Sequence, residues 1–221
     1  MSRPILYDYF RSSAAYRVRI ALNLKGVDFE SRQIDLRDDQ QRSDHYRTLN
    51  PQGLVPMMEI DGHRLTQSLA IINYLDLRYP NQPLIPASAA ERAHVVTLAM
   101  IVACDIHPLN NLRVLKYLKN ELGQPQDQVD AWYRHWISER LPALETLAAP
   151  QAGKFLFGDG PTGADVLLVP QLYNARRYDV PLDDYPTLLR AEENANKLEA
   201  FAAAHPDRQG SHQSSTLMGS R

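Results

Sequence analysis

The stretch LNPQGLVPMMEIDGHRLTQSLAIINYLD (residues 49–76) decides the fold of this chain. Two short runs, 57–60 and 63–66, flank Asp61-Gly62, the dipeptide preferred in two-residue hairpin turns. Apolar side chains then recur at helical spacing from residue 67 to residue 78. The stretch therefore predicts an antiparallel strand pair followed by a helix.

The residues before this stretch predict a strand, a helix and a second strand. The apolar run PILYDYF (4–10) has the length and composition of a buried strand. Ser12 and Ser13 are candidate helix N-caps, and Gly26 stands where a left-handed residue would end that helix. Residues 27–35 then alternate as a strand. The order is β-α-β followed by β-β-α.

An X-Pro bond directly before the first hairpin strand is typical of thioredoxin-like domains. In them a cis proline exposes the backbone of the preceding residue to a peptide-like ligand. We expect Val55-Pro56 to be that cis bond, although only about 5–6% of X-Pro bonds in folded proteins are cis.

The remainder of the chain reads as helical after a proline-rich linker at 79–86. The predicted helices are 88–120, 126–148, 162–178 and 186–203, with kinks or breaks at Pro108, Pro142 and Pro170. The expected domains are an α/β module (1–84), an all-helical module (88–205) and a disordered polar tail (206–221).

Composition excludes several classes of function. The 221 residues hold 24 Lys+Arg against 26 Asp+Glu, a net charge of -2, so no basic surface for nucleic acid is predicted. The single cysteine, Cys104, allows neither an intramolecular disulfide nor a dithiol redox pair. No metal site, membrane span or secretion signal is predicted, and we expect a cytoplasmic protein.

Two helix starts are candidate ligand sites. The first predicted helix begins without the cysteine of thioredoxin-like redox proteins, so Ser12 and Ser13 either only cap it or also hold the thiolate of a bound ligand such as glutathione. Ser68 either caps its helix or binds a carboxylate.

Five segments resemble zeta-class glutathione transferases, and the resemblance covers roughly residues 4–205. They are SSAAYRVRIALNLKGVDFE (12–30), LNPQGLVPMMEIDG (49–62), LTQSLAIINYLD (65–76), DIHPLNNLRVLKYL (105–118) and NARRYDVPLDDYP (174–186). The family signature SSCSWRVRIAL is matched except at Ala14, Ala15 and Tyr16, where the family has Cys, Ser and Trp.

The resemblance implies the glutathione transferase fold and a cytoplasmic homodimer. It also implies glutathione-dependent cis–trans isomerisation of maleylacetoacetate to fumarylacetoacetate in tyrosine and phenylalanine breakdown. In that reaction the thiolate adds to the double bond, the resulting single bond rotates, and elimination restores the trans double bond. Isomerisation of maleylpyruvate, a general transferase or dehalogenase activity, and a non-catalytic glutathione-binding carrier remain alternatives.

The resemblance also carries over a set of site residues. The catalytic candidates are Ser12, preferred for the sulfur, with Ser13 and Arg17. The predicted glutathione contacts are Ser12, Ser13, Ala14, Ala15, Tyr16, Arg17, Gln41, Val55, Gln67, Ser68, His107, Asn111, Leu112 and Arg113. The predicted substrate contacts are Arg11, Arg176 and Arg177. Because adjacent helical side chains point about 100° apart, only one of the last two should face the cleft, and Arg176 is preferred.

Other motifs indicate structural roles. Thr162–Asp165 matches a helix capping box, and Arg19 is expected in a structural ion pair. Trp132, Tyr133 and Trp136 have the spacing of core or interface residues. Cys104 is expected to be a buried small residue.

Overall fold

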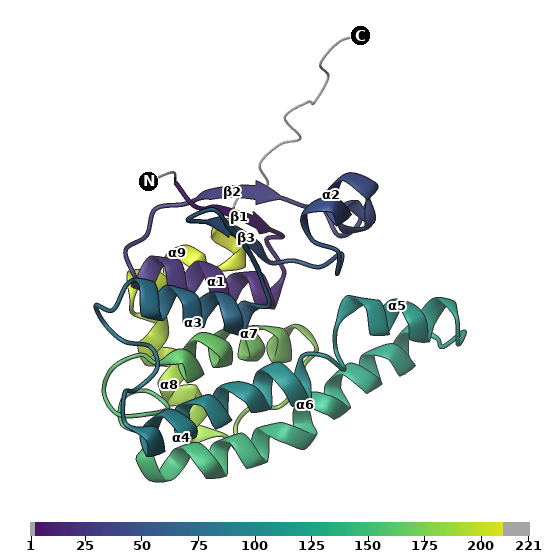
Figure 1. Cartoon of the computed structure of the whole chain (residues 1–221). Helices are drawn as coiled ribbons and strands as arrows, with labels where there is room; N and C mark the ends of the chain where they lie inside the picture. Colours follow the sequence, from purple (N-terminus) through teal and green to yellow (C-terminus); the bar gives the residue numbers. More distant parts are fainter. Residues whose placement is uncertain (1–2, 210–221) are drawn as a thin grey trace.

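A computed structural model describes residues 3–209 and shows a four-stranded mixed sheet in the N-terminal part of the chain (Figure 1). The strand order is β2-β1-β3-β4. Strand β1 (Ile5–Asp8) pairs in parallel with β2 (Glu30–Gln33) and antiparallel with β3 (Met57–Ile60), which pairs antiparallel with β4 (His63–Thr66). The predicted two parallel strands and antiparallel pair are confirmed.

The sequence signals around the hairpin are confirmed as well. Asp61 and Gly62 both have positive φ, 49° and 80°, as a type I′ turn requires. The Val55-Pro56 bond is cis. The second strand is shorter than predicted, because β2 pairs with the four residues of β1 alone; Val27 and Phe29 lie before it and pack against the core.

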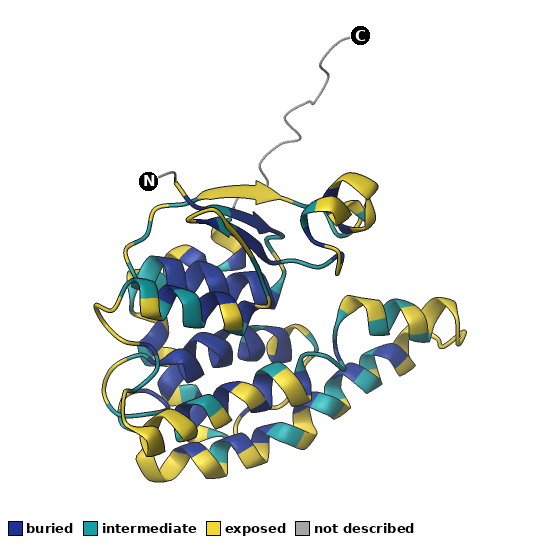
Figure 2. Ribbon diagram, in the orientation of Figure 1, coloured by how far each residue is buried: buried dark blue, intermediate teal, exposed yellow. Residues whose placement is uncertain are grey.

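Three helices belong to this part of the chain. They are α1 (Ser13–Leu24), α2 (Asp44–Leu49) and α3 (Ser68–Arg78), with a 3₁₀ turn at Gln40–Arg42. Figure 1 shows α1 and α3 beneath the sheet and α2 beside it. Figure 2 shows β2 exposed along its length, whereas α1 is among the most buried helices.

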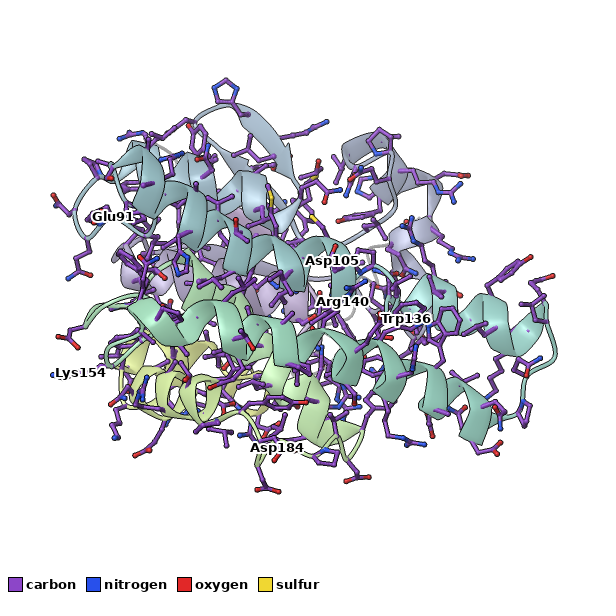
Figure 3. All side chains as sticks on the ribbon, turned by 90° about the horizontal axis from the view of Figure 1, so that it is seen from below. Glu91, Asp105, Trp136, Arg140, Lys154 and Asp184 are labelled. Carbon is purple, nitrogen blue, oxygen red and sulfur yellow. The ribbon has the colours of Figure 1, made fainter. Side chains whose placement is uncertain are left out.

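The C-terminal part is helical. Its elements are α4 (Ala89–Met100), a π-helical segment (Ile101–Ile106), α5 (Leu112–Asn120), α6 (Gln126–Ala148), a 3₁₀ turn (Ala149–Gln151), α7 (Gly163–Arg177), α8 (Pro186–Asn196), α9 (Glu199–Ala204) and a 3₁₀ turn (Pro206–Arg208). Helix α6 packs against the π-helical segment, and Figure 3 labels Asp105, Trp136 and Arg140 along this contact.

The interruption predicted at Pro108 is confirmed, and it divides the helical segment predicted at 88–120 into α4, the π-helical segment and α5. His107 N–H donates to the carbonyl of Val102, five residues back, and a turn precedes the new helix that Asn111 caps. In contrast, α6 and α7 continue through Pro142 and Pro170. The break separates α4 from α5 and leaves His107 at a turn.

The structure describes the first residues of the predicted tail. Residues 206–208 form a 3₁₀ turn, and Pro206 is buried. The rest of the predicted disordered tail, 210–221, lies outside the described residues. Within residues 3–209, no helix has both the length and the apolar character needed to span a membrane.

Two buried polar clusters hold α1 and α7 in place. Arg19 donates to both carboxylate oxygens of Asp8, at 2.7 and 2.9 Å, and to the Ala204 carbonyl at 3.1 Å, which ties α1 to α9. Asp165 accepts from Thr162 N–H and Oγ1, both at 2.8 Å, in the predicted capping box of α7. Burial raises the pKa of Asp165 to about 6. Both structural predictions are confirmed.

Candidate functional site

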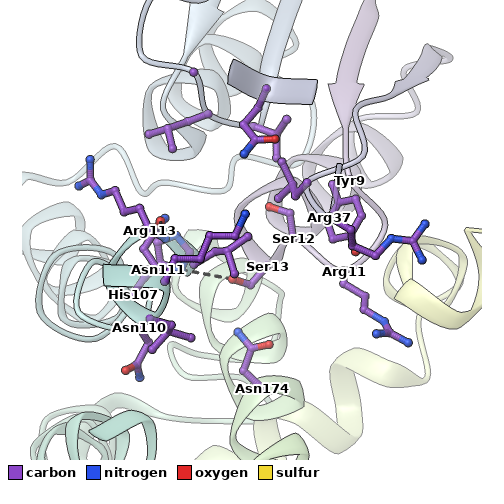
Figure 4. Close-up of a pocket in the computed structure, with 18 of the residues that line it drawn as sticks. Tyr9, Arg11, Ser12, Ser13, Arg37, His107, Asn110, Asn111, Arg113 and Asn174 are labelled. Atoms are coloured by element: carbon purple, nitrogen blue, oxygen red, sulfur yellow. Dashed lines mark hydrogen bonds between the residues drawn. The ribbon is translucent and has the colours of Figure 1, made fainter. Parts of the chain in front are cut away.

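A cleft of about 580 Å³ opens where the N-terminus of α1 faces the helical part of the chain (Figure 4). Ten of the residues predicted from sequence line it: Arg11, Ser12, Ser13, Gln41, Val55, His107, Asn111, Leu112, Arg113 and Arg177. A smaller adjoining pocket of about 190 Å³ shares part of this lining and adds Ala14, Arg17, Gln67 and Ser68. The fold therefore brings most of the predicted site together.

The start of α1 places two hydroxyls at the cleft. Ser12 is the N-cap, and its Oγ accepts from the Ala15 N–H at 3.2 Å. The Oγ of Ser13 lies 3.3 Å from Nδ1 of His107, which comes from the other side of the cleft (Figure 4). Because the helix N-terminus carries a partial positive charge, an anion such as a thiolate is stabilised beside Ser12.

His107 is neutral at ordinary pH. Burial, and then the positive charges of Arg17 and Arg113, lower its pKa to about 3. The contact with Ser13 is therefore one between two uncharged groups. The imidazole orients the serine hydroxyl and adds no charge to the cleft.

Arg17 is a fully buried cation with unused hydrogen-bond donors. Its Nη1 donates to Ser68 Oγ at 3.4 Å, and among the described residues its Nε and Nη2 have no partner. Burial lowers its pKa to about 10, so it still carries a charge at neutral pH. A buried cation normally has an anionic partner, so the pocket at the start of α3 fits a carboxylate of a ligand.

Two of the predicted contacts, Ala15 and Tyr16, lie outside both pockets. Ala15 is fully buried and Tyr16 is 1% exposed, and neither lines the cleft or the smaller pocket. The Tyr16 ring packs edge-on against Tyr173 and His205. Because α1 is covered by α3, α7 and α9, positions one residue from the cleft already belong to the core.

The preference for Arg176 over Arg177 is wrong. Arg176 pairs with Glu192 of α8 through two contacts of 2.5 Å and does not line the cleft. Arg177 does line it, with its guanidinium 5.9 Å from the ring centres of Tyr173 and Tyr178. The two neighbouring side chains thus point in different directions, as the step of about 100° per residue along a helix requires.

Sequence reasoning missed several residues of the site. The segment after β2, from which only Gln41 was predicted, also places Arg37, Arg42 and Arg47 on the cleft wall. Tyr133, expected in the core or an interface, stacks on Tyr178 with ring centres 3.6 Å apart, and both rings line the cleft. Clustered arginines in the segment 36–47 were the available signal.

Cys104 is exposed and lines the smaller pocket, which corrects the expected burial. Elsewhere among the described residues, no group of three His, Cys, Asp or Glu side chains is arranged to hold a metal ion.

Comparison with known proteins agrees with this architecture. The protein-family model for the glutathione S-transferase N-terminal domain matches residues 3–77, and the family model for the C-terminal domain matches residues 130–194. A probable maleylacetoacetate isomerase of Vibrio cholerae is 48% identical over 212 residues, which is 95% of this chain and 98% of the relative. A maleylpyruvate isomerase of a Ralstonia species is 44% identical over 91% of this chain and 96% of its own.

Comparison with solved structures also finds proteins named as maleyl pyruvate or maleylacetoacetate isomerases. The holo structure of a bacterial zeta-class maleyl pyruvate isomerase matches with a TM-score of 0.91 at 43% identity, covering 94% of this chain and 99% of its own. A maleylacetoacetate isomerase of Anaeromyxobacter dehalogenans with bound GSH matches with a TM-score of 0.85 at 43% identity, covering 94% and 97%.

Proposed function

The chain belongs to the glutathione S-transferase family, and from that premise we propose that it is a glutathione-dependent cis–trans isomerase that converts maleylacetoacetate to fumarylacetoacetate. The observation that carries the proposal is the placement of Ser12, at the N-terminus of α1, in a cleft whose walls hold cations from both parts of the chain. Among the described residues, Arg11, Arg113 and Arg177 in this cleft make no ion pair with a carboxylate.

The residues present fit glutathione, a peptide thiol with two carboxylates. The unpartnered donors of buried Arg17, the Ser68 hydroxyl and the start of α3 suit the carboxylate of its γ-glutamyl end. Val55 lies beside both pockets and offers its backbone to the cysteinyl amide. When bound, glutathione supplies the thiol that adds to the substrate double bond and later leaves it.

Ser12 is better placed than Ser13 to hold that sulfur ionised. The Ser12 oxygen accepts a hydrogen bond from Ala15, so its own proton is free to donate into the cleft. The Ser13 hydroxyl is already shared with His107. The positive end of α1 adds to the stabilisation of a thiolate beside Ser12.

The remaining cations suit the substrate, which carries a carboxylate at each end. Arg11 and Arg177 line the same cleft as Ser12, so a carboxylate held by either lies near the reacting double bond. Both guanidiniums lie against aromatic rings, of Phe10 for Arg11 and of Tyr173 and Tyr178 for Arg177, which limits their motion. Fixed cations of this kind stabilise negative charge as it develops.

The experiment is an absorbance assay with purified protein. Loss of maleylacetoacetate is followed with glutathione, without thiol, and with S-methylglutathione, which fills the site but has no thiol. Turnover with glutathione alone supports the proposal, and its absence overturns it. Binding of glutathione with no turnover of either maleylacetoacetate or maleylpyruvate identifies a carrier protein instead.

Maleylpyruvate isomerisation is the second candidate, because the zeta-class structure with a TM-score of 0.91 is a maleyl pyruvate isomerase. The ratio of kcat/KM for the two substrates decides between them. Activity only on other electrophiles, or on α-haloacids, identifies a general transferase or a dehalogenase.

We further propose a role in tyrosine and phenylalanine breakdown, a cytoplasmic location and a homodimeric state. Light scattering of the purified protein tests the homodimer. Accumulation of the cis substrate in cells that lack the protein tests the metabolic role.

A further inference from the structure

An ion pair joins the segment after β2 to the helical part of the chain at the cleft. Nζ of Lys116, on α5, donates to both carboxylate oxygens of Asp39 at 2.8 and 3.0 Å. Figure 1 shows α2, which follows this segment, above α5. Lys116 itself lines the cleft.

Asp39 also accepts a hydrogen bond from Gln41. One oxygen of Asp39 accepts from Nε2 of Gln41 at 2.9 Å, and Lys116 and Gln41 both lower the pKa of Asp39 by their hydrogen bonds. Asp39 has a φ of 52°, a left-handed conformation that Asp and Asn adopt more readily than most residues. The carboxylate thus bridges an ammonium on one side and an amide on the other.

Gln41 is held in the wall of the cleft with an unsatisfied acceptor. It is 7% exposed, it lines the cleft, and its buried Oε1 has no hydrogen-bond partner among the described residues. With Nε2 bonded to Asp39, Oε1 is the atom left to interact with a ligand. A buried acceptor of this kind requires a donor, and the amide N–H groups of a peptide ligand are donors.

We propose that Lys116 and Asp39 are positioning residues, which hold the amide of Gln41 so that Oε1 accepts a hydrogen bond from an N–H group of bound glutathione. The inference rests on the glutathione binding proposed above. It assigns to α5 a contribution to cofactor affinity through two residues that need not touch the cofactor.

The expected loss of glutathione affinity depends on how far the Lys116–Asp39 ion pair is exposed to solvent. The Lys116 and Asp39 side chains are 31% and 43% exposed, and ion pairs at such places contribute modestly. We expect Lys116→Met to weaken glutathione binding about two- to fivefold. Lys116→Arg keeps the charge and should bind within about a factor of two of the wild type.

The test measures the Kd of glutathione by calorimetry, a readout that does not depend on turnover. Lys119→Met is the matched control, because Lys119 lies on the same helix, bonds to Gln126 and does not line the cleft. The decisive comparison is made in a Gln41→Met background, in which Lys116→Met should add no further loss of affinity.

Additive losses in the double variant would overturn the inference, as would an unchanged Kd for Lys116→Met or an equal loss for Lys119→Met. Wild-type protein that binds no glutathione would instead overturn the proposed function. Wild-type protein that binds glutathione without isomerase activity leaves the positioning test fully informative.

Discussion

Replacing Arg176 and Arg177 by methionine, one at a time, should lower thermal stability in the first variant and catalytic efficiency in the second. The two residues have the same charge and adjacent positions on α7, but only Arg177 lines the cleft. Methionine keeps much of the apolar stem, while it removes the guanidinium and its contacts with the Tyr173 and Tyr178 rings.

For Arg177→Met we expect a loss in kcat/KM with little change in stability. Among the described residues Arg177 makes no ion pair, so folding loses little when its charge is removed. A hydrogen bond to a charged group contributes about 1.5–3 kcal/mol, which corresponds to roughly a 10- to 150-fold lower kcat/KM. The Kd of glutathione should stay close to that of the wild type.

For Arg176→Met we expect the opposite pattern. Its partner, Glu192, has a side chain only 8% exposed, whereas the side chain of Arg176 is 49% exposed. Loss of the cation leaves a largely buried carboxylate without its ion-pair partner. Because water reaches one side of the pair, we discount the full penalty to about 1–2 kcal/mol, a fall in Tm of about 2–8 °C.

Steady-state kinetics and thermal unfolding of both variants provide the measurement. A loss of substrate affinity in Arg176→Met at unchanged Tm would refute the assignment of Arg177 to the cleft. Equal kinetic losses in both variants would show that the effect follows net charge and not position.

Three further changes test other parts of the site. Ser12→Ala should raise the pKa of the bound glutathione thiol by about one to two units, measured by ultraviolet titration of the thiolate, and an unchanged titration would exclude Ser12. His107 has a folded pKa of about 3, below its unfolded value, so stability present above pH 6.5 is lost as pH falls from about 6.5 toward 3. His107→Gln should flatten this dependence in urea unfolding, and an identical slope would contradict it. Gly53→Ala puts a Cβ at φ 61° and 3.0 Å from the Gln41 carbonyl oxygen, so it should weaken glutathione binding as well as cost about 1–2 kcal/mol of stability. Gly26→Ala, at φ 63° in open space, should cost stability alone, and weaker binding in this control would remove the link to Gln41.

Local signals predicted most of the fold, because each acts over a few residues. The Asp61-Gly62 turn, the proline at position 56 and the serines that begin α1 are all found where their chemistry places them. The break predicted at Pro108 is found as well, but the π-helical form of Ile101–Ile106 before it was not predicted, because no local sequence signal marks it.

The site was predicted less completely, because it depends on contacts between distant segments. Helical spacing shows that Arg176 and Arg177 face apart, but only the place of Glu192 on α8 shows which of them faces the cleft. Likewise, the signature of α1 marks Tyr16 as part of a motif, yet the packing of α7 and α9 against it puts that ring in the core. The residue types in the sequence indicated which kinds of group the site contains, whereas tertiary packing determines which of those residues line the cleft.

The replacement of the family cysteine by Ala14 limits where the reacting thiol can come from. Ala14 lines the smaller pocket, and the one cysteine of the chain, Cys104, lines that pocket and not the cleft that holds Ser12. The positive end of α1 and the free proton of Ser12 are therefore directed at a site where the chain itself supplies no thiol. Thiol chemistry at this helix terminus requires a sulfur that the ligand brings, and Ala14 does not prevent it.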